Sequence, residues 1–290
     1  MKTVGEAENR AYVVGCGDVG RRLGQALMAA GHPVTALVRR PDSARRLASL
    51  GMTVSVVDLD SQTPPAVEAK WIFYLVPPPG EGEDDPRLGR FLRAQDGAGP
   101  EALVLLSTTA VYGDAGGTWV DESVPPRPAT ARGRRRLEAE RRAVDAARRW
   151  SARLAILRVA GIYGPGRLPL ERLRRGEPVL APECSPPSNR IHVDDLVDAC
   201  LAAAERGEGV YNVADGHPSP MSDYFEGIAR LFDLPSPPRI DRAEAERCLS
   251  PGMLSYLSES RRIDNSRLLR LLGRPLRYPD LTSGLPACRD

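Results

Sequence analysis

The 290-residue sequence has little net charge, because 40 basic residues are set against 38 acidic ones and the formal net charge at pH 7 is only +2. So small an excess creates no overall field that would favour nucleic acid or an anionic membrane as a partner. The chain also lacks any run of about 18 apolar residues, the length that a membrane-spanning helix needs. We therefore expect neither a nucleic-acid nor a membrane partner.

Histidine and cysteine are also scarce. The three histidines lie far apart, and the five cysteines are scattered, odd in number and without metal-ligand spacing. A zinc site is therefore not expected, and the thiols are predicted to be reduced, as in a cytoplasmic protein. Residues 1–10 have no apolar core, which argues against a secretory signal and for a cytoplasmic location.

Lysine is almost absent: only Lys2 and Lys70 occur, so 40 − 2 = 38 of the basic residues are arginines. These arginines are spread along the chain and interleaved with Glu and Asp, a pattern typical of a solvated surface. Surface exposure is therefore the default expectation for any single arginine.

The first half of the chain alternates between two periodicities. Apolar runs predict strands at 11–15, 34–38, 52–57, 71–76, 102–106 and 154–158, and helical patterns cover 19–28, 45–50, 84–94 and 132–150. Strands that are apolar throughout and separated by helices form a parallel sheet covered on both faces. The sequence thus predicts an α/β protein with a doubly wound parallel sheet.

The second half is broken by proline clusters into shorter pieces. Helical patterns cover 193–204, 221–232 and 265–272, and a strand is predicted at 209–213. We expect a first domain over residues 1–162, with residues 191–213 returning to it. The remainder of residues 163–290 is expected to form a smaller carboxy-terminal substrate lobe.

A glycine-rich turn follows the first predicted strand. Gly15, Gly17 and Gly20 form the pattern G-x-G-x-x-G, with Asp18 and Val19 opening the next helix. In a dinucleotide-binding turn the first glycine permits the tight turn, the second lets the pyrophosphate approach, and the third lets the helix pack on the sheet. Free N–H groups at the helix N-terminus then bind the phosphates. Because the turn lies within a βαβ unit, it predicts a nicotinamide dinucleotide site.

The residues that follow the second predicted strand indicate which dinucleotide binds. NAD-binding turns place a carboxylate there for the ribose hydroxyls, whereas this chain has Arg39 and Arg40. Two guanidiniums suit a 2′-phosphate, so NADP is preferred and NAD remains an alternative; ordinary surface arginines are the competing interpretation. Asp58, Leu59 and Val76 are assigned to the same cofactor site.

Four ordered motifs carry a resemblance to a known family. They are the glycine-rich turn, Ser107–Gly113, Leu157–Gly166 and Arg190–Asp195. Together they resemble the extended short-chain dehydrogenase/reductase superfamily, of the nucleotide-sugar epimerase/dehydratase type. The resemblance implies a Rossmann-type dinucleotide-binding domain with a smaller substrate lobe.

In that family a Ser or Thr after the fifth strand and a Tyr-x-x-x-Lys pair on the next helix carry the chemistry. Thr108 matches the Ser/Thr position, but Arg132 stands at the tyrosine position and Arg136 at the lysine position. A guanidinium, with a pKa above about 12, cannot donate a proton near neutrality, although Arg136 could still hold ribose hydroxyls. The resemblance therefore implies an atypical member.

Three interpretations of this departure remain open. Tyr112 or Tyr163 could supply the proton, or the protein could sense NADP(H) without turnover. Alternatively, the arginines could polarise an anionic small-molecule substrate. Tyr163, Arg190 and His192 are assigned to the substrate side, although a histidine beside Asp194 at a helix start is commonly structural. We expect a monomer or homodimer.

Overall fold

The computed structural model describes residues 9–97 and 99–289. Contacts between residues divide the chain into two compact units. Unit 1 comprises residues 1–111, 131–158 and 197–211, and unit 2 comprises residues 112–130, 159–196 and 212–290. The domain boundaries expected from the sequence stay a prediction. The absence of a secretory signal was predicted for residues 1–10, most of which lie outside the described residues.

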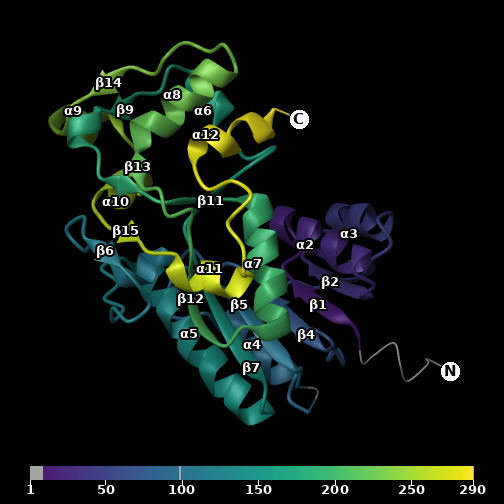
Figure 1. Ribbon diagram of the computed structural model, residues 1–290. Helices are drawn as coiled ribbons and strands as arrows, with labels where there is room; N and C mark the ends of the chain where they lie inside the picture. Colours follow the sequence, from purple (N-terminus) through teal and green to yellow (C-terminus); the bar gives the residue numbers. More distant parts are fainter. Residues whose placement is uncertain (1–8, 98, 290) are drawn as a thin grey trace. The chain divides into compact units, whose positions relative to one another are not determined.

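Unit 1 is built on a seven-stranded sheet in the order β12-β7-β5-β4-β1-β2-β3 (Figure 1). Its strands are β1 (Ala11–Val14), β2 (Val34–Val38), β3 (Thr53–Val56), β4 (Trp71–Tyr74), β5 (Ala102–Thr108), β7 (Arg153–Val159) and β12 (Gly209–Val213). The pairs β1–β2, β1–β4, β2–β3 and β4–β5 are parallel. The order reverses at β1, as in the Rossmann fold, and the predicted α/β doubly wound sheet is confirmed.

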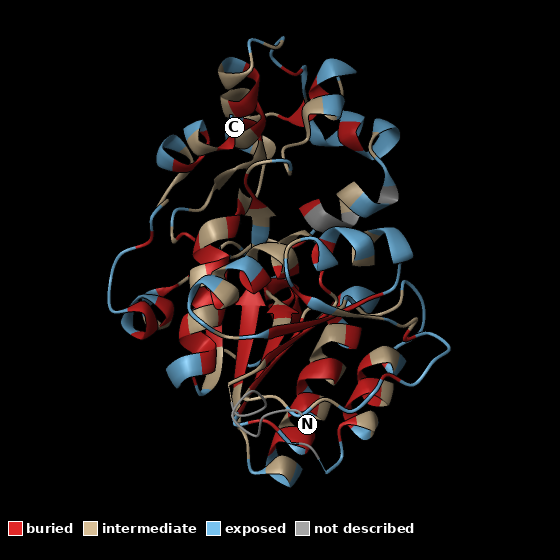
Figure 2. Cartoon of the chain, turned by 90° about the vertical axis from the view of Figure 1, so that its right-hand side faces the viewer, coloured by how far each residue is buried: buried red, intermediate tan, exposed pale blue. Residues whose placement is uncertain are grey.

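Alternation along β1 shows that helices cover both faces of the sheet. Tyr12 and Val14 belong to the core cluster formed with α4 (Pro86–Ala94) and α5 (Ala131–Trp150). Val13 points the opposite way, and a Cβ on Gly20 of α2 (Asp18–Ala29) would lie 3.2 Å from its Cγ1 atom. The short helix α3 (Pro41–Ala48) follows β2, and α7 is formed by Val193–Arg206. The strands of this sheet are mostly buried (Figure 2).

The packing of α5 matches the prediction from its sequence only in part. The helical pattern of residues 132–150 predicts that Leu137, Val144, Ala147 and Trp150 face inward; Ala147 is buried, whereas the other three are only half-buried. The fully buried apolar residues of the helix are alanines: Ala139, Ala143, Ala146 and Ala147. Small side chains let the helix axis lie close to the sheet, so packing distance rather than residue size sets the inward face.

Unit 2 consists of short helices and two-stranded pairings. Its pairings are β6 (Trp119–Val120) with β15 (Arg262–Ile263), β8 (Gly161–Tyr163) with β11 (Arg190–His192), β9 (Val179–Leu180) with β14 (Arg239–Ile240), and β10 (Pro187–Ser188) with β13 (Ser219–Pro220). Its helices are α6 (Leu170–Arg174), α8 (Met221–Leu231), α9 (Arg242–Cys248), α10 (Pro251–Leu257), α11 (Ser266–Leu272) and α12 (Leu281–Gly284). A core around Tyr163, Phe225 and Leu285 joins α6, α8 and α12.

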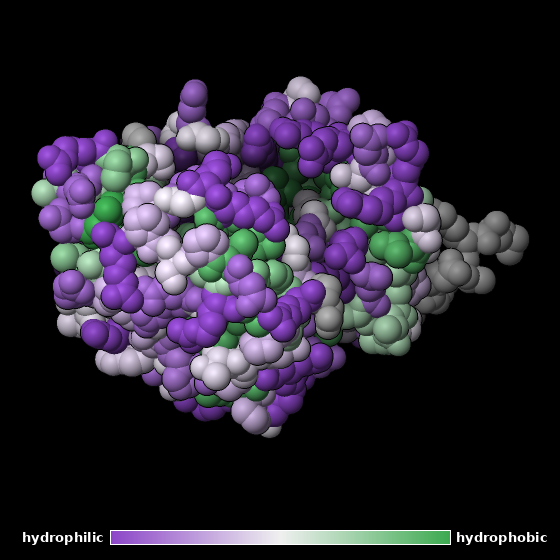
Figure 3. Space-filling model, turned by 90° about the horizontal axis from the view of Figure 1, so that it is seen from above, coloured by the Kyte–Doolittle hydropathy of each residue, from purple (hydrophilic) through white to green (hydrophobic). Residues whose placement is uncertain are grey.

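One face of the molecule is seen in Figure 3. Hydrophilic residues cover most of the face seen in Figure 3, and apolar residues gather there only in small patches. Among the described residues, no helix combines the length and the apolar character needed to cross a membrane.

Candidate functional site

The glycine-rich turn between β1 and α2 has a different geometry at each glycine. Gly15 has φ +83°, and a Cβ there would lie 2.6 Å from Val76 Cγ2, so only glycine fits. A Cβ on Gly20 would lie 3.2 Å from Leu75 Cδ1, where α2 packs on the sheet. A Cβ on Gly17 would meet only the Gly15 carbonyl oxygen, at 4.0 Å. The space beside Gly17 is therefore open, whereas the other two glycines are enclosed by the protein.

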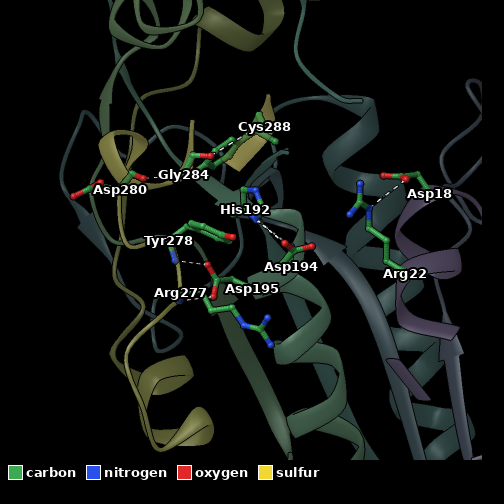
Figure 4. A network of polar contacts seen from close by, with 11 residues as sticks. Asp18, Arg22, His192, Asp194, Asp195, Arg277, Tyr278, Asp280, Gly284 and Cys288 are labelled. Atoms are coloured by element: carbon green, nitrogen blue, oxygen red, sulfur yellow. Dashed lines mark hydrogen bonds and ion pairs between the residues drawn. The ribbon is translucent and has the colours of Figure 1, made fainter. Parts of the chain in front are cut away.

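The start of α2 carries a small charge network. Asp18 Oδ1 lies 3.2 Å from Arg21 Nη2 and 3.4 Å from Arg22 Nε, and Figure 4 shows the second pair. A carboxylate in the first turn interacts favourably with the helix dipole. Val19, beside it, is half-buried.

A cavity of about 310 Å³ opens next to the turn, entirely within unit 1. It is lined by seven residues that the sequence assigned to a cofactor: Gly15, Gly17, Arg39, Arg40, Asp58, Leu59 and Val76. Arg39 and Arg40 are exposed, and Leu59 is buried. The structure thus gathers residues from the ends of β1, β2, β3 and β4 around one space, while their role in binding a nucleotide stays a prediction.

Eight further lining residues were not assigned from the sequence: Cys16, Leu37, Val38, Ser43, Val57, Asp60, Pro77 and Arg87. Arg87 lies in the first turn of α4, and its ion pair with Asp60 holds the pKa of that carboxyl below its usual range. Neither residue belongs to a motif, so only the three-dimensional position of α4 reveals them.

The predicted catalytic residues of unit 1 do not line this cavity. Thr108 ends β5, is half-buried, and accepts a hydrogen bond from the Ala110 N–H at 3.3 Å. Arg132 is exposed, whereas Arg136 is half-buried and places Nη1 3.4 Å from the Val76 carbonyl oxygen. Burial lowers the pKa of Arg136, against the opposing effects of the nearby Asp85, Tyr74 and Glu140. The two arginines therefore occupy different environments.

A buried polar network ties α5 to the sheet, and the sequence analysis missed it. The Glu140 carboxylate accepts hydrogen bonds from Arg158 Nε at 3.1 Å and Nη2 at 2.8 Å, and also from the Ser107 hydroxyl. The side chains of Arg158 and Glu140 are each only 5% exposed. Glu140 lies one turn after Arg136, so this pair fixes the helix at the predicted catalytic position. The signal in the sequence was a carboxylate on a face otherwise made of alanines.

The two alternative proton donors lie in unit 2 and are engaged there. The Tyr112 hydroxyl donates to Asn212 Oδ1 at 2.8 Å, and the Tyr163 hydroxyl donates to the Asp280 carbonyl oxygen at 3.3 Å. Burial is the main cause that raises the pKa of Tyr163, with a smaller effect from Asp215. Both side chains are almost fully buried. This environment disfavours loss of the Tyr163 proton.

The predicted substrate residues Arg190 and His192 are also buried in unit 2. The Arg190 guanidinium lies over the Tyr224 ring at 4.4 Å from its centroid. His192 Nδ1 accepts a hydrogen bond from the Asp194 N–H at 3.2 Å, and its ring lies 4.0 Å from that of Tyr278 (Figure 4). Arg190 and His192 therefore both contact other residues of unit 2.

A second cavity, of about 840 Å³, lies in unit 2 and has none of the predicted site residues in its lining. Its lining comes mainly from α8 and the segment 280–289, and also includes Trp119 and His217. Asp215, two residues before His217, was not predicted either, and burial raises its pKa to about 7. Within residues 9–97 and 99–289, no group of His, Cys, Asp or Glu is arranged to hold a metal ion.

Family comparisons agree with this architecture. The profile of the NAD dependent epimerase/dehydratase family matches residues 88–214, and that of the ketopantoate reductase PanE/ApbA family matches residues 11–74. Residues 88–214 thus match the epimerase/dehydratase type that the four motifs resemble. The resemblance that the four motifs indicated is thereby confirmed.

Two curated relatives differ in how much of their length is matched. The chain is 33% identical to Protein YeeZ of Escherichia coli K12 over 61% of this chain and 59% of that protein. It is also 29% identical to the 3-diazoavenalumate denitrifying reductase of a Streptomyces species, over 95% of this chain and 99% of that protein. The match therefore spans less than two thirds of YeeZ but nearly all of the reductase.

Two solved structures are similar over almost the whole chain. A functionally unknown conserved protein from Silicibacter pomeroyi DSS is 33% identical, with a TM-score of 0.84 over 97% of this chain and 98% of that one. MoeE5, whose structure is a complex with UDP-glucose and NAD, is 26% identical, with a TM-score of 0.75 over 96% of this chain and 97% of that one.

Proposed function

We propose that this protein binds NADP(H) and uses it as an oxidoreductase acting on a small molecule, with a catalytic centre that lacks the usual tyrosine and lysine. The observation that carries the proposal is the open space beside Gly17, next to a cavity lined from the ends of four strands. A pyrophosphate can approach the backbone there without displacing a side chain. The dinucleotide would supply hydride transfer.

The ends of β2 and β3 support the choice of NADP. Arg39 and Arg40 line the cavity and are exposed, so both guanidiniums are accessible to a 2′-phosphate. The carboxylates that line the cavity, Asp58 and Asp60, follow β3 rather than β2. The position at which NAD-binding turns hold the ribose hydroxyls therefore carries positive charge.

The residues of the catalytic region favour reduction over epimerisation. An epimerase or dehydratase needs a base to remove a substrate proton as hydride leaves, but Arg132 cannot serve as one near neutrality. In a reduction the substrate oxygen only gains a proton, which water can supply. We assign Thr108 to hydrogen bonding with that oxygen, and the exposed Arg132 to an anionic group of the substrate. Similarity to a protein named a reductase supports this direction.

Arg136 is assigned to the cofactor side of the centre. Its contact with the Val76 carbonyl places it beside a residue that lines the cavity. A fixed cation with several donors can hold ribose hydroxyls as the family lysine does, without taking part in proton transfer.

Titration calorimetry with NADPH and NADH tests the binding proposal. We expect NADPH to bind at least tenfold more tightly, and mass spectrometry should find the same nucleotide in the purified protein. A screen of carbonyl compounds for NADPH oxidation then tests the chemistry. Tight NADPH binding with no turnover would favour the sensing function. The hydrogen bonds that engage the hydroxyls of Tyr112 and Tyr163 also support that function. Failure to bind either dinucleotide would contradict the proposal.

A further inference from the structure

The cavity in unit 1 contains one arginine whose position the glycine-rich motif does not explain. Arg87 reaches the cavity from the first turn of α4, after the buried Asp85 that caps this helix by accepting the Leu88 N–H at 3.0 Å. Its side chain is 19% exposed, which sets it apart from the exposed Arg39 and Arg40.

Three hydrogen bonds fix the orientation of the planar Arg87 guanidinium. Nε donates to Asp60 Oδ1 at 2.6 Å, and Nη2 donates to Asp60 Oδ2 at 2.6 Å, which forms a two-pronged contact. Nη1 donates to the Pro77 carbonyl oxygen at 3.1 Å. Such a fork fixes the orientation of both planar groups. Arg87 thereby joins the segments that follow β3 and β4.

These contacts determine what the side chain can offer a ligand. The Asp60 carboxylate already pairs with the charge, and N–H groups on all three guanidinium nitrogens point to protein oxygens. Arg87 is therefore a poor phosphate ligand, whereas Arg39, Arg40 and the turn at Gly17 remain available to anions. What the planar group presents is its flat face, and guanidinium faces stack well on aromatic rings.

Apolar residues also line this cavity, among them Leu37, Val57, Leu59, Val76 and Pro77. Apolar side chains beside a fixed flat cation suit a planar heterocycle with little charge of its own. The base of a dinucleotide bound at the glycine-rich turn has this chemistry.

We propose that Arg87, held flat by Asp60 and Pro77, is the stacking platform for the adenine base of the dinucleotide. This inference rests on the proposed function, since it assigns one part of the same ligand. It makes Arg87 a binding residue and Asp60 a positioning residue, neither of which contacts the reacting atoms.

The experiment compares three probes by titration calorimetry on the full chain. NADPH contains both halves of the ligand, 2′,5′-ADP has only the adenosine half, and reduced nicotinamide mononucleotide has only the other. We expect Arg87→Leu to weaken NADPH and 2′,5′-ADP by the same factor of about ten and to leave the mononucleotide unchanged. The matched control is Arg93→Leu, which alters an exposed arginine on the same helix and should bind all probes as the parent does.

Two more variants separate stacking from charge and from misfolding. Arg87→Lys keeps the charge but has no flat face, so it should bind 2′,5′-ADP as weakly as Arg87→Leu. Asp60→Asn keeps the guanidinium but fixes its orientation less firmly. The loss of affinity should therefore be smaller and should affect only NADPH and 2′,5′-ADP. Circular dichroism should show all variants folded.

The outcomes distinguish the two proposals. If the parent protein binds NADPH and Arg87→Leu binds 2′,5′-ADP equally well, the platform is wrong and the proposed function stands. Full affinity in Arg87→Lys would likewise overturn stacking in favour of charge. If the parent binds no dinucleotide, both proposals fail.

Discussion

The glycine-rich turn and the helix α5 are the two parts of unit 1 that this superfamily combines in one active site, and they match its pattern to different degrees. At the turn, every glycine has a distinct geometric reason: a positive φ at Gly15, open space at Gly17 and close helix packing at Gly20. On α5, the helix contains the buried Glu140, and the positions at which the resemblance predicts the reactive pair carry Arg132 and Arg136.

The comparison teaches that binding and chemistry depend on different properties of the chain. The turn recognises phosphate through backbone N–H groups and a helix end, so it needs only glycine and a particular backbone path. Proton transfer needs a side chain of suitable pKa at one position. Replacement of two side chains can therefore remove the second property while the first stays intact.

The largest effect is expected where α5 is anchored. Glu140→Gln leaves the buried Arg158 guanidinium without its charge partner, which should lower the free energy of unfolding by about 3–5 kcal/mol. Urea denaturation measures this loss. The control is Glu138→Gln, which removes a solvent-accessible partner of Arg142 and should change stability by no more than about 0.5 kcal/mol. Equal stability of the two variants would show that the buried pair does not anchor the helix.

At the turn, a substitution should separate binding from folding. Gly17 has φ −79° and open space beside it, so Gly17→Val should fold normally but block the pyrophosphate and weaken NADPH by about a hundredfold or more. Calorimetry and thermal melting measure the two properties. Gly15→Ala should instead destabilise the fold by about 1–3 kcal/mol, because its Cβ meets Val76. Unchanged NADPH affinity in Gly17→Val would contradict the assignment of the turn to a dinucleotide.

A smaller effect is expected for the choice of cofactor. Replacing Arg39 and Arg40 together with Ala removes two charge-assisted contacts, so the preference for NADPH over NADH should fall by at least about tenfold. The double variant Arg45→Ala/Arg46→Ala, on the neighbouring α3, serves as the control. If the parent protein binds both dinucleotides equally, the arginines do not read the 2′-phosphate.

The smallest effects should distinguish the two arginines at the positions that we predict to be catalytic. Arg136→Ala removes a half-buried side chain that contacts Val76, so NADPH affinity should fall by a few-fold, a loss of about 1 kcal/mol. Arg132→Ala alters an exposed side chain and should leave both stability and NADPH affinity unchanged, with an effect only on turnover of a substrate. If both variants behave as the parent does in every assay, α5 carries surface charge and no site.

Much of the fold was predictable because its signals are local. The apolar strands, the helices between them and the glycine-rich turn each depend on residues adjacent in the sequence, and all appear where the pattern placed them within a few residues. The family followed from four ordered motifs. The inward face of α5 was predicted only in part: Ala147 is buried as expected, but the helix also buries Ala139, Ala143 and Ala146, whose small side chains carry a weak apolar signal.

The candidate site was predictable only in part for a similar reason. The residues of the turn and the ends of β2 to β4 form one cavity, as their positions after parallel strands suggested. Asp60 and Arg87 are 27 residues apart and belong to no motif, so their contact arises only from the folded backbone. The same holds for the hydrogen bond between Tyr112 and Asn212, which engages a tyrosine that looked reactive in the sequence.

The hydrogen bonds of Asp195 have a consequence for the order of events during synthesis. Its carboxylate accepts the N–H groups of Arg277 at 2.7 Å and Tyr278 at 3.0 Å, across 82 and 83 residues of chain (Figure 4). Asn212 likewise donates to the Asp264 carbonyl oxygen, 52 residues later. Contacts between residues so far apart in the sequence form late, because the entropy of closing the loop is lost before the contacts stabilise the fold. Unit 2 therefore cannot reach its native state until the ribosome has translated the chain as far as Tyr278. Until then the nascent chain of unit 2 needs protection from aggregation.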